Sequence, residues 1–431
     1  MGRVFNTTGV CIPEKHYMVD INGRLQQIKV LVDGGKYFTI NRARQYGKTT
    51  TLCALAEMLR DEYYVVLLDF QTFDNEKFSN GNVFSVAFAG SFLRVLRRNC
   101  KTMNNEMASV IDEMRKDADY ANRYFSLKEL FEGLSDICEA ADRKIVLMID
   151  EVDSAANNQV FIDFLAQLRA QYLDREFYPG FQSVILAGVY DIKNLKRKLR
   201  PEEGHRYNSP WNIAADFSIE MSFSESEIAG MLQEYESDHR TGMNISKMSE
   251  LLYAYTAGYP FLVSRICQLM DERVRDEYEN LKLVWTENGF NEAVRILLAE
   301  KNPLFESLVG KICDYPELSV MLKTLLFTGR NIAYNPDETS IDMAQMFGFI
   351  KNQNGNVVIA NRIFETRLYN YYLTEAKMQQ TEIYKAALQD KSQFIVNGYL
   401  DMERILERFV VHFQDIYGES DEKFLEEQGR K

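Results

Sequence analysis

Residues that could bind an anion or a metal ion are grouped at Gly47-Lys48-Thr49-Thr50, between an apolar run at residues 36–40 and a helical pattern that follows. A loop between a strand and a helix binds phosphate through its backbone N–H groups and the positive helix N-terminus. In such a loop the lysine reaches the outer phosphates and the threonine hydroxyl ligates Mg²⁺. The sequence therefore predicts a nucleotide site. The predicted contacts are Arg44, Gln45, Tyr46, Gly47, Lys48, Thr49 and Thr50.

The match to the phosphate-loop pattern G-x-x-x-x-G-K-[ST] has one departure, because Arg42 stands where the first glycine belongs. The alternative interpretation is a glycine and a basic residue in a polar loop before an amphipathic helix. The context favours the nucleotide site: the preceding residues are typical of a buried strand, and the following apolar residues recur at helical spacing. These apolar residues are Leu52, Leu55, Ala56 and Leu59.

A second apolar run, residues 145–149, ends in Asp150-Glu151. Five consecutive apolar residues are typical of a central parallel strand that is buried on both faces, and its carboxyl end opens into the ligand crevice. We predict that Asp150 holds the metal and that Glu151 polarises the water that attacks the γ-phosphate. The alternative is a buried strand that ends in a solvated acidic turn.

Two further apolar runs are predicted strands. A strand at about residues 63–70 contains the apolar run 64–68 that ends in Asp69, a rival metal ligand, and we expect this strand to neighbour the loop strand. Residues 183–188 are the strand that usually presents a γ-phosphate sensor, but no arginine follows at its tip. The sequence thus gives little support for a sensor on this strand.

Strands that alternate with helices indicate an α/β fold with a mostly parallel sheet. We predict four parts: residues 1–220 as a P-loop α/β domain with a helical insertion at about 83–141, residues 221–300 as a helical lid, residues 301–375 as a winged-helix-like domain, and residues 376–431 as a helical C-terminal segment that begins a truncated further domain.

Local signals place elements within these parts. Ser224 and Glu227 form a capping-box pattern at the start of a helix. Gly258-Tyr259-Pro260 is expected to end one helix and begin the next, either as a plain connector or as a kink that puts Tyr259 and Pro260 against adenine. Around Asn354-Gly355, two short apolar runs within residues 346–360 predict a β-hairpin.

The formal net charge of −13 argues against a surface built for nonspecific nucleic-acid binding. One basic patch, residues 193–200, is either a solvated helix face, a source of a trans-acting arginine, or a contact for nucleic-acid phosphates. No apolar run has membrane-spanning length, and no signal peptide is recognisable, so we expect a cytoplasmic protein without a membrane partner. Scattered cysteines indicate neither a zinc site nor a disulfide framework.

These motifs resemble a family of prokaryotic AAA-like ATPases related to archaeal-type and STAND-like P-loop NTPases. The likeness spans most of residues 1–375 and includes a tolerated non-glycine at the first loop position. The segments that carry it are residues 5–9, 13–17, 35–38, 43–50, 149–153, 258–260 and 361–365. The resemblance implies that Pro260 contacts the base. Some members carry a C-terminal PD-(D/E)XK nuclease-like region, and residues 424–431 resemble the helix that would open one, although its catalytic strand is absent here.

We therefore expect an ATPase that binds ATP with Mg²⁺ and hydrolyses it to ADP and phosphate, acting as a nucleotide-dependent conformational switch. An alternative is a nucleic-acid-binding winged-helix scaffold whose nucleotide site is structural or degenerate. A third is an oligomeric platform for protein interactions. The partners to consider are ATP and ADP, a second copy of the chain, and DNA bound through the winged helix or a nuclease-like region.

Overall fold

The computed structural model describes residues 2–99, 103–189, 211–277, 281–327, 331–374, 395–396, 399–400 and 406. The chain forms two compact units, residues 1–365 and 366–431. Among the described helices, none combines the length and the apolar character needed to cross a membrane.

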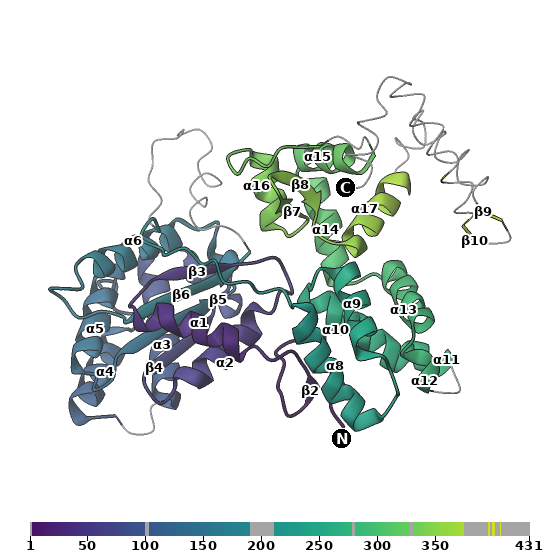
Figure 1. Ribbon diagram of the computed structural model, residues 1–431. Coiled ribbons are helices and arrows are strands. Elements are labelled where there is room, and N and C mark those ends of the chain that lie inside the picture. Colours follow the sequence, from purple (N-terminus) through teal and green to yellow (C-terminus); the bar gives the residue numbers. More distant parts are fainter. Residues whose placement is uncertain are drawn as a thin grey trace. The chain divides into compact units, whose positions relative to one another are not determined.

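Four parallel strands form the central sheet of the first unit (Figure 1). They are β3 (Phe38–Asn41), β4 (Tyr64–Asp69), β5 (Ile145–Asp150) and β6 (Ser183–Gly188), and their order in space is β3-β6-β5-β4. The predicted α/β class with a parallel sheet is confirmed. The expectation that the strand ending at Asp69 neighbours the loop strand is wrong, because in the described four-stranded sheet β4 pairs with β5 and lies at the edge opposite β3.

The strand β5 shows why the sheet is buried on both faces. All six of its residues are buried, and successive side chains point to opposite faces. Ile145, Leu147 and Ile149 join a large apolar core with the helices α3 (Gly81–Asn99), α4 (Asn105–Asp117), α5 (Leu127–Ala140) and α6 (Gln159–Leu173). On the other face the sheet contacts α2 (Lys48–Leu59), and α2 in turn packs on α1 (Asn22–Asp33).

The stretch predicted as a helical insertion thus consists of α3, α4 and α5, which share one core with the sheet. Ser126 starts α5 with a capping box in which its side chain and that of Glu129 exchange hydrogen bonds with backbone N–H groups. Near the N-terminus, β1 (Val4–Phe5) and β2 (His16–Tyr17) form a small parallel pair.

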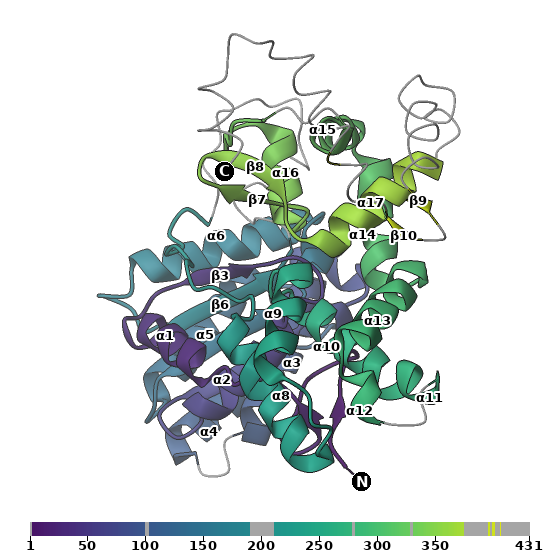
Figure 2. The same ribbon diagram turned by 45° about the vertical axis from the view of Figure 1, so that its right-hand side comes forward.

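A group of helices follows residue 220 (Figure 2). It contains α8 (Glu225–His239), α9 (Ile245–Thr256), α10 (Pro260–Leu269) with a π-helical turn (Met270–Val274), α11 (Arg275–Glu277), α12 (Leu281–Val284) and α13 (Glu287–Ala299). The predicted capping box of Ser224 and Glu227 is confirmed at the start of α8.

The Gly-Tyr-Pro kink is also confirmed, since α9 ends at Thr256 and Pro260 occupies the first turn of α10. Gly258 has φ +71°, and a Cβ built there would lie 1.9 Å from the Phe223 carbonyl oxygen. In the same contact the Phe223 N–H donates to the Gly258 carbonyl oxygen at 2.8 Å. Only glycine therefore fits at this position.

We expect Gly258→Ala to lower the free energy of unfolding by about 2–4 kcal/mol, because the new methyl group meets backbone and the residue is strained at positive φ. Gly230→Ala, inside α8 with no atom within 4 Å of the new Cβ, is the control and should stabilise the protein by about 0.5–1 kcal/mol. Urea unfolding compares the variants. Equal stability of Gly258→Ala and wild type would contradict the close packing at the kink.

The described residues between 303 and 359 form three helices and a hairpin: α14 (Pro303–Asp314), α15 (Pro316–Phe327), α16 (Thr339–Met346), β7 (Ile350–Gln353) and β8 (Asn356–Ile359). The predicted hairpin is confirmed. Its turn residues Asn354 and Gly355 both have positive φ, as the tight hairpin turns that Asn-Gly favours require. The order of elements suits the winged-helix interpretation, which remains a prediction.

The helix α17 (Arg362–Thr374) runs from the end of the first unit into the second. Within the segment predicted to be helical, β9 (Ile395–Val396) and β10 (Tyr399–Leu400) pair as antiparallel strands, so the expectation of helix is wrong at these residues. A short apolar run is compatible with either a strand or a helix, so its sequence pattern does not distinguish a small hairpin from a continuous helix. The nuclease-like helix predicted at residues 424–431 lies outside the described residues.

Candidate functional site

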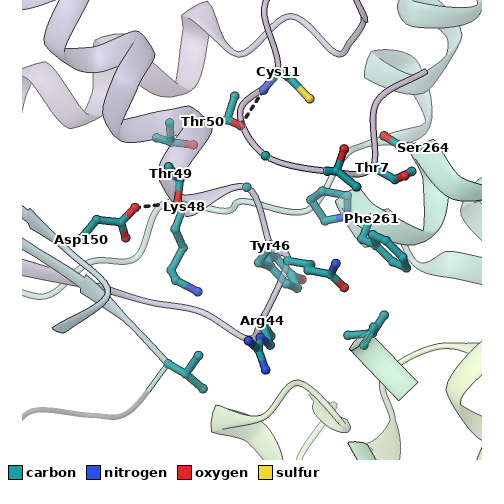
Figure 3. Close-up of a pocket in the computed structure, with 18 of the residues that line it drawn as sticks. Thr7, Cys11, Arg44, Tyr46, Lys48, Thr49, Thr50, Asp150, Phe261 and Ser264 are labelled. Atoms are coloured by element: carbon teal, nitrogen blue, oxygen red, sulfur yellow. Dashed lines mark hydrogen bonds between the residues drawn. The ribbon is translucent and has the colours of Figure 1, made fainter. Parts of the chain in front are cut away.

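A cavity of about 730 Å³ lies at the carboxyl ends of the strands and collects most of the predicted site residues (Figure 3). Its walls come from residues within the N-terminal segment 6–11 and within 18–24, the loop and helix start at residues 44–51, the ends of β4, β5 and β6, Phe223, and the later helical segments. The lining includes every predicted loop contact together with Asp150, Glu151 and Pro260.

The backbone of the loop explains the departure at Arg42. Positive φ occurs at Gln45 (+56°) and Gly47 (+79°), the residue that caps α2, but not at Arg42. The Arg42 side chain turns away to donate to the Ile219 carbonyl oxygen at 2.8 Å, with its guanidinium 5.4 Å from the ring centre of Phe217. A glycine is therefore not needed at position 42.

Lys48 is buried at the first position of α2, with 6% of its surface exposed. Its ammonium donates to the carbonyl oxygens of Arg42 and Ala43 at 3.0 and 3.1 Å. Burial lowers the pKa of Lys48, although Glu151, Asp153 and Asp150 counter this effect through their charges. A buried cation in a cavity is a strong point of attraction for an anion.

Thr49 and Asp150 bring the loop and the end of β5 together. The Thr49 hydroxyl donates to Asp150 Oδ2 at 2.5 Å, as the dashed line in Figure 3 shows. Asp150 is 4% exposed, whereas Thr49 is exposed. The two predicted metal-binding residues are therefore in direct contact, although they lie 101 positions apart in the sequence.

Glu151 follows in the left-handed conformation, with φ +52°. Its N–H donates to Asp150 Oδ1 at 2.9 Å, and its carboxyl group lines the cavity. Burial raises the pKa of Glu151; Lys48 opposes the shift and Asp150 adds to it. A non-glycine residue at positive φ is uncommon and is found where the surrounding structure fixes it, often in functional sites.

Asp153 connects this strand end to the next one. Its Oδ2 accepts a hydrogen bond from the Val189 N–H at 2.6 Å, just beyond β6. Asp69, the rival ligand, also lines the cavity and lies opposite Asp150 in the β4–β5 register. Its Oδ1 accepts the Gln71 N–H at 2.8 Å, so it caps the turn after β4. Thr49 contacts Asp150 rather than Asp69.

No binding role was predicted for the N-terminal segment, which forms the opposite wall of the cavity together with α10. The Cys11 N–H donates to Thr50 Oγ1 at 3.2 Å, which holds the N-terminal segment over the start of α2. Figure 3 shows Thr7 on this segment near Phe261 and Ser264 of α10, away from Lys48 and Asp150. The segment Phe5-Asn-Thr-Thr-Gly9, already part of the family resemblance, was the signal that could have found it.

Pro260 lies in the cavity wall as predicted, but Tyr259 does not. Tyr259 is 3% exposed, and its hydroxyl donates to the Arg44 carbonyl oxygen. Tyr46, a predicted loop contact, meets the Tyr259 ring with 4.6 Å between ring centres. The expectation that Tyr259 faces a base is therefore wrong, since its ring and hydroxyl are directed to the loop.

Residues from the later segment complete the cavity. One face of α14 contributes residues spaced three and four apart, and the turn before β7 adds two phenylalanines. No sequence signal pointed to them, because they resemble ordinary core positions. They are Leu304, Ser307, Leu308, Lys311, Phe347 and Phe349. The basic patch at residues 193–200 lies outside the described residues.

The pattern of the AAA-like domain family matches residues 13–375. This chain belongs to the AAA-like domain family. The Walker-type ATPase PABY2304 of Pyrococcus abyssi is similar in structure to the AAA-like chain, with a TM-score of 0.57 and 13% sequence identity over 85% of this chain and 99% of that one. No curated protein sequence matches.

A weaker similarity connects the AAA-like chain to Cdc6p of Pyrobaculum aerophilum, with a TM-score of 0.40, 13% identity, and 85% of this chain and 97% of that one covered. At these identities the comparison with the Pyrococcus protein establishes the fold alone, and the comparison with Cdc6p adds nothing to it. The match thus confirms the AAA-like part of the predicted resemblance. A C-terminal nuclease region is not shown by it.

Proposed function

We propose that this AAA-like chain binds ATP together with Mg²⁺ and hydrolyses it to ADP and phosphate, and that occupancy of the cavity controls how its segments pack. The observation that carries the proposal is the hydrogen bond of Thr49 to Asp150 beside the buried Lys48. This bond brings residues 44–50 and the carboxylate at the end of β5 together in one cavity, and the structurally similar Pyrococcus protein is a Walker-type ATPase.

Loop residues 44–50 would bind the phosphates. The left-handed Gly47 starts α2, so the first N–H groups of the helix and its positive end are directed to the loop. Lys48 would exchange its two carbonyl partners for phosphate oxygens, which are better acceptors for a buried ammonium because they are charged.

The residues at the strand end suit Mg²⁺. A hydroxyl and a carboxylate, both oxygen donors, lie 2.5 Å apart, and this hard cation prefers oxygen ligands with a few carboxylates. Thr49 and Asp150 would hold the ion. When bound, Mg²⁺ neutralises charge that develops on the phosphate oxygens.

Glu151 is the proposed general base. Its carboxyl group lines the cavity next to Asp150, and its raised pKa brings its basicity closer to neutral pH. In the deprotonated form it would accept a proton from the water that attacks the γ-phosphate. The Glu151 backbone, tied to Asp150 at 2.9 Å, fixes where that carboxylate can reach.

The adenine ring of the nucleotide would lie at the other end of the cavity, between the N-terminal segment and α10. Pro260 and Phe261 give apolar surface there, while Thr7 and Ser264 add hydroxyl groups. Apolar walls with a few polar groups are typical of small-molecule sites. An adenine in this position would separate the base from the charged end of the cavity, where Lys48 and Asp150 lie.

A switch follows from the composition of the walls. Besides the sheet and loop, both α10 and the segment with α14 line the cavity, so a ligand contacts three parts of the chain at once. A ligand shifts a conformational equilibrium by its differential affinity for the two states.

The nucleic-acid scaffold receives no comparable support: α16, the third helix of the winged-helix interpretation, contains no Lys or Arg and includes Asp342.

Phosphate release by the purified chain tests the enzymatic part of the proposal. We expect turnover with ATP and Mg²⁺ that stops when a chelator removes the ion, because the Thr49 and Asp150 oxygens would then have no cation to hold. Turnover that continues unchanged in excess chelator would contradict the metal assignment. No phosphate release above background would contradict hydrolysis by this chain alone.

A further inference from the structure

Tyr259 touches the phosphate-binding loop at two points without entering the cavity. Its hydroxyl donates to the Arg44 carbonyl oxygen, and the edge of one ring meets the face of the other between Tyr259 and Tyr46 at 4.6 Å and 71°. Burial raises the pKa of Tyr259 well above its ordinary value, which keeps its hydroxyl in the donor form. The contact reaches from the helical segment across 215 positions of sequence.

The same loop is held from a second side. The Tyr46 hydroxyl lies 2.9 Å from Ser222 Oγ. Ser222 itself is fixed, because its N–H donates to Glu220 Oε1 at 2.8 Å and its carbonyl oxygen accepts from the Arg24 guanidinium at 3.2 Å. Tyr46 therefore connects the loop to a hydrogen-bonded network around residues 220–222, while Tyr259 contacts the same loop from the helical segment.

Gln45 lies between the two residues that are held. It has φ +56° although it is not a glycine, a conformation that costs free energy and persists where its surroundings fix it. Arg44 on one side accepts from Tyr259, and Tyr46 on the other packs against the Tyr259 ring. These contacts are the ones placed to fix Gln45.

The segment after residue 301 reaches the same point. Phe364 packs edge-on against Tyr259 with 5.3 Å between ring centres. Gly348, at φ +74°, packs closely against the same residues, since a Cβ there would lie 2.8 Å from Ala43 Cβ and 3.8 Å from Tyr259 Cε2. Tyr259 thus contacts the loop and Phe364 of α17, and Gly348, just before β7, lies beside its ring.

We propose that Tyr259 is a positioning residue for the phosphate-binding loop: its hydroxyl and ring hold residues 44–46 with Gln45 at positive φ, so that phosphate affinity depends on the helical and hairpin segments being packed on the loop. This inference rests on the proposed nucleotide binding. It also accounts for a loop that works without the first glycine, since contacts from outside the loop set its shape.

Tyr259→Phe tests it by removing only the hydroxyl. Loss of one buried hydrogen bond should weaken ATP binding about three- to tenfold in calorimetric titration. Tyr235→Phe is the matched control, because Tyr235 is an equally buried tyrosine of the same helical segment whose hydroxyl donates to Asp271 at 2.6 Å, and it does not line the cavity. It should lose stability without losing ATP affinity.

A second variant separates positioning from general destabilisation. Glycine adopts positive φ without steric cost, so in a Gln45→Gly background the loop no longer needs the tyrosine to hold this conformation. The loss of ATP affinity caused by Tyr259→Phe should then be smaller than in wild type, a coupling that a double-mutant cycle measures. Equal losses in both backgrounds would overturn the positioning role.

The outcomes also separate this inference from the proposed function. Wild-type binding that is lost in Lys48→Ala, together with a Tyr259→Phe variant that binds ATP as tightly as wild type, would overturn the inference and leave nucleotide binding intact. Absence of ATP binding by the wild-type chain would overturn both.

Discussion

Replacing Lys48 with alanine is expected to weaken ATP binding about 100- to 1,000-fold, since hydrogen bonds to charged groups contribute about 1.5–3 kcal/mol each and a P-loop lysine makes more than one. The Lys48 ammonium is buried in the cavity and donates hydrogen bonds to two loop carbonyl oxygens. Calorimetric titration with ATP and Mg²⁺ measures the loss.

Lys29→Ala is the control for this prediction. Lys29 pairs with Asp33 at 3.0 Å and with Glu62 at 2.8 Å, and it does not line the cavity. Because these ion pairs lie outside the cavity, ATP affinity should stay close to wild type even where their loss lowers the thermal midpoint. An Lys48→Ala variant that is folded and binds ATP as tightly as Lys29→Ala would mean that the cavity is not a phosphate site.

Replacing Glu151 with glutamine is expected to leave ATP affinity little changed and to lower turnover about 100- to 10,000-fold, the usual contribution of a positioned general base. Glutamine keeps the shape of the side chain and can follow the same backbone, including the N–H bond to Asp150. Phosphate release and calorimetric titration on the same sample separate the two effects.

Asp69→Asn is the matched control, because Asp69 is also a carboxylate that lines the cavity at a strand end, but it caps Gln71 and asparagine can accept the same hydrogen bond. Its turnover should remain near wild type. Unchanged hydrolysis in Glu151→Gln would contradict the assignment of the base, and a large loss in Asp69→Asn would move the metal site toward β4.

The raised pKa of Glu151 adds a pH dependence to this prediction. A general base works when deprotonated, so turnover should fall as the pH drops through its pKa. Burial places that pKa above the ordinary glutamate value of 4.5, and the acid limb of the wild-type profile should lie above it too. The limb should disappear from the residual activity of Glu151→Gln, because glutamine does not titrate.

Local patterns predicted much of the fold. The run that ends in Asp150-Glu151 is continuous because β5 is buried on both faces. Ser224 and Asn354-Gly355 act through caps and turns within a few residues, so they can be recognised without knowledge of the rest of the chain. The meeting of Thr49 with Asp150 could be anticipated because Thr49 follows the carboxyl end of one parallel strand and Asp150 ends another, and such ends lie at the same edge of the sheet.

Long-range packing was not predictable in this way. The order β3-β6-β5-β4 depends on which strands pair, and adjacency in sequence wrongly suggested that β4 lies beside β3. The contact of Tyr259 with Arg44 joins residues 215 positions apart. A buried tyrosine and an exposed arginine are common residues, so nothing in the sequence marks this pair. The same holds for Lys311, whose place in the cavity wall follows from the packing of α14.

Calorimetric titration of the wild-type chain with ATP and with a non-hydrolysable analogue, each in Mg²⁺ and in chelator, tests the central claim most directly. We expect saturable binding of both nucleotides that weakens when the chelator removes Mg²⁺, since the Thr49 and Asp150 oxygens are placed to hold the ion. No measurable binding of either nucleotide by the folded protein would contradict it.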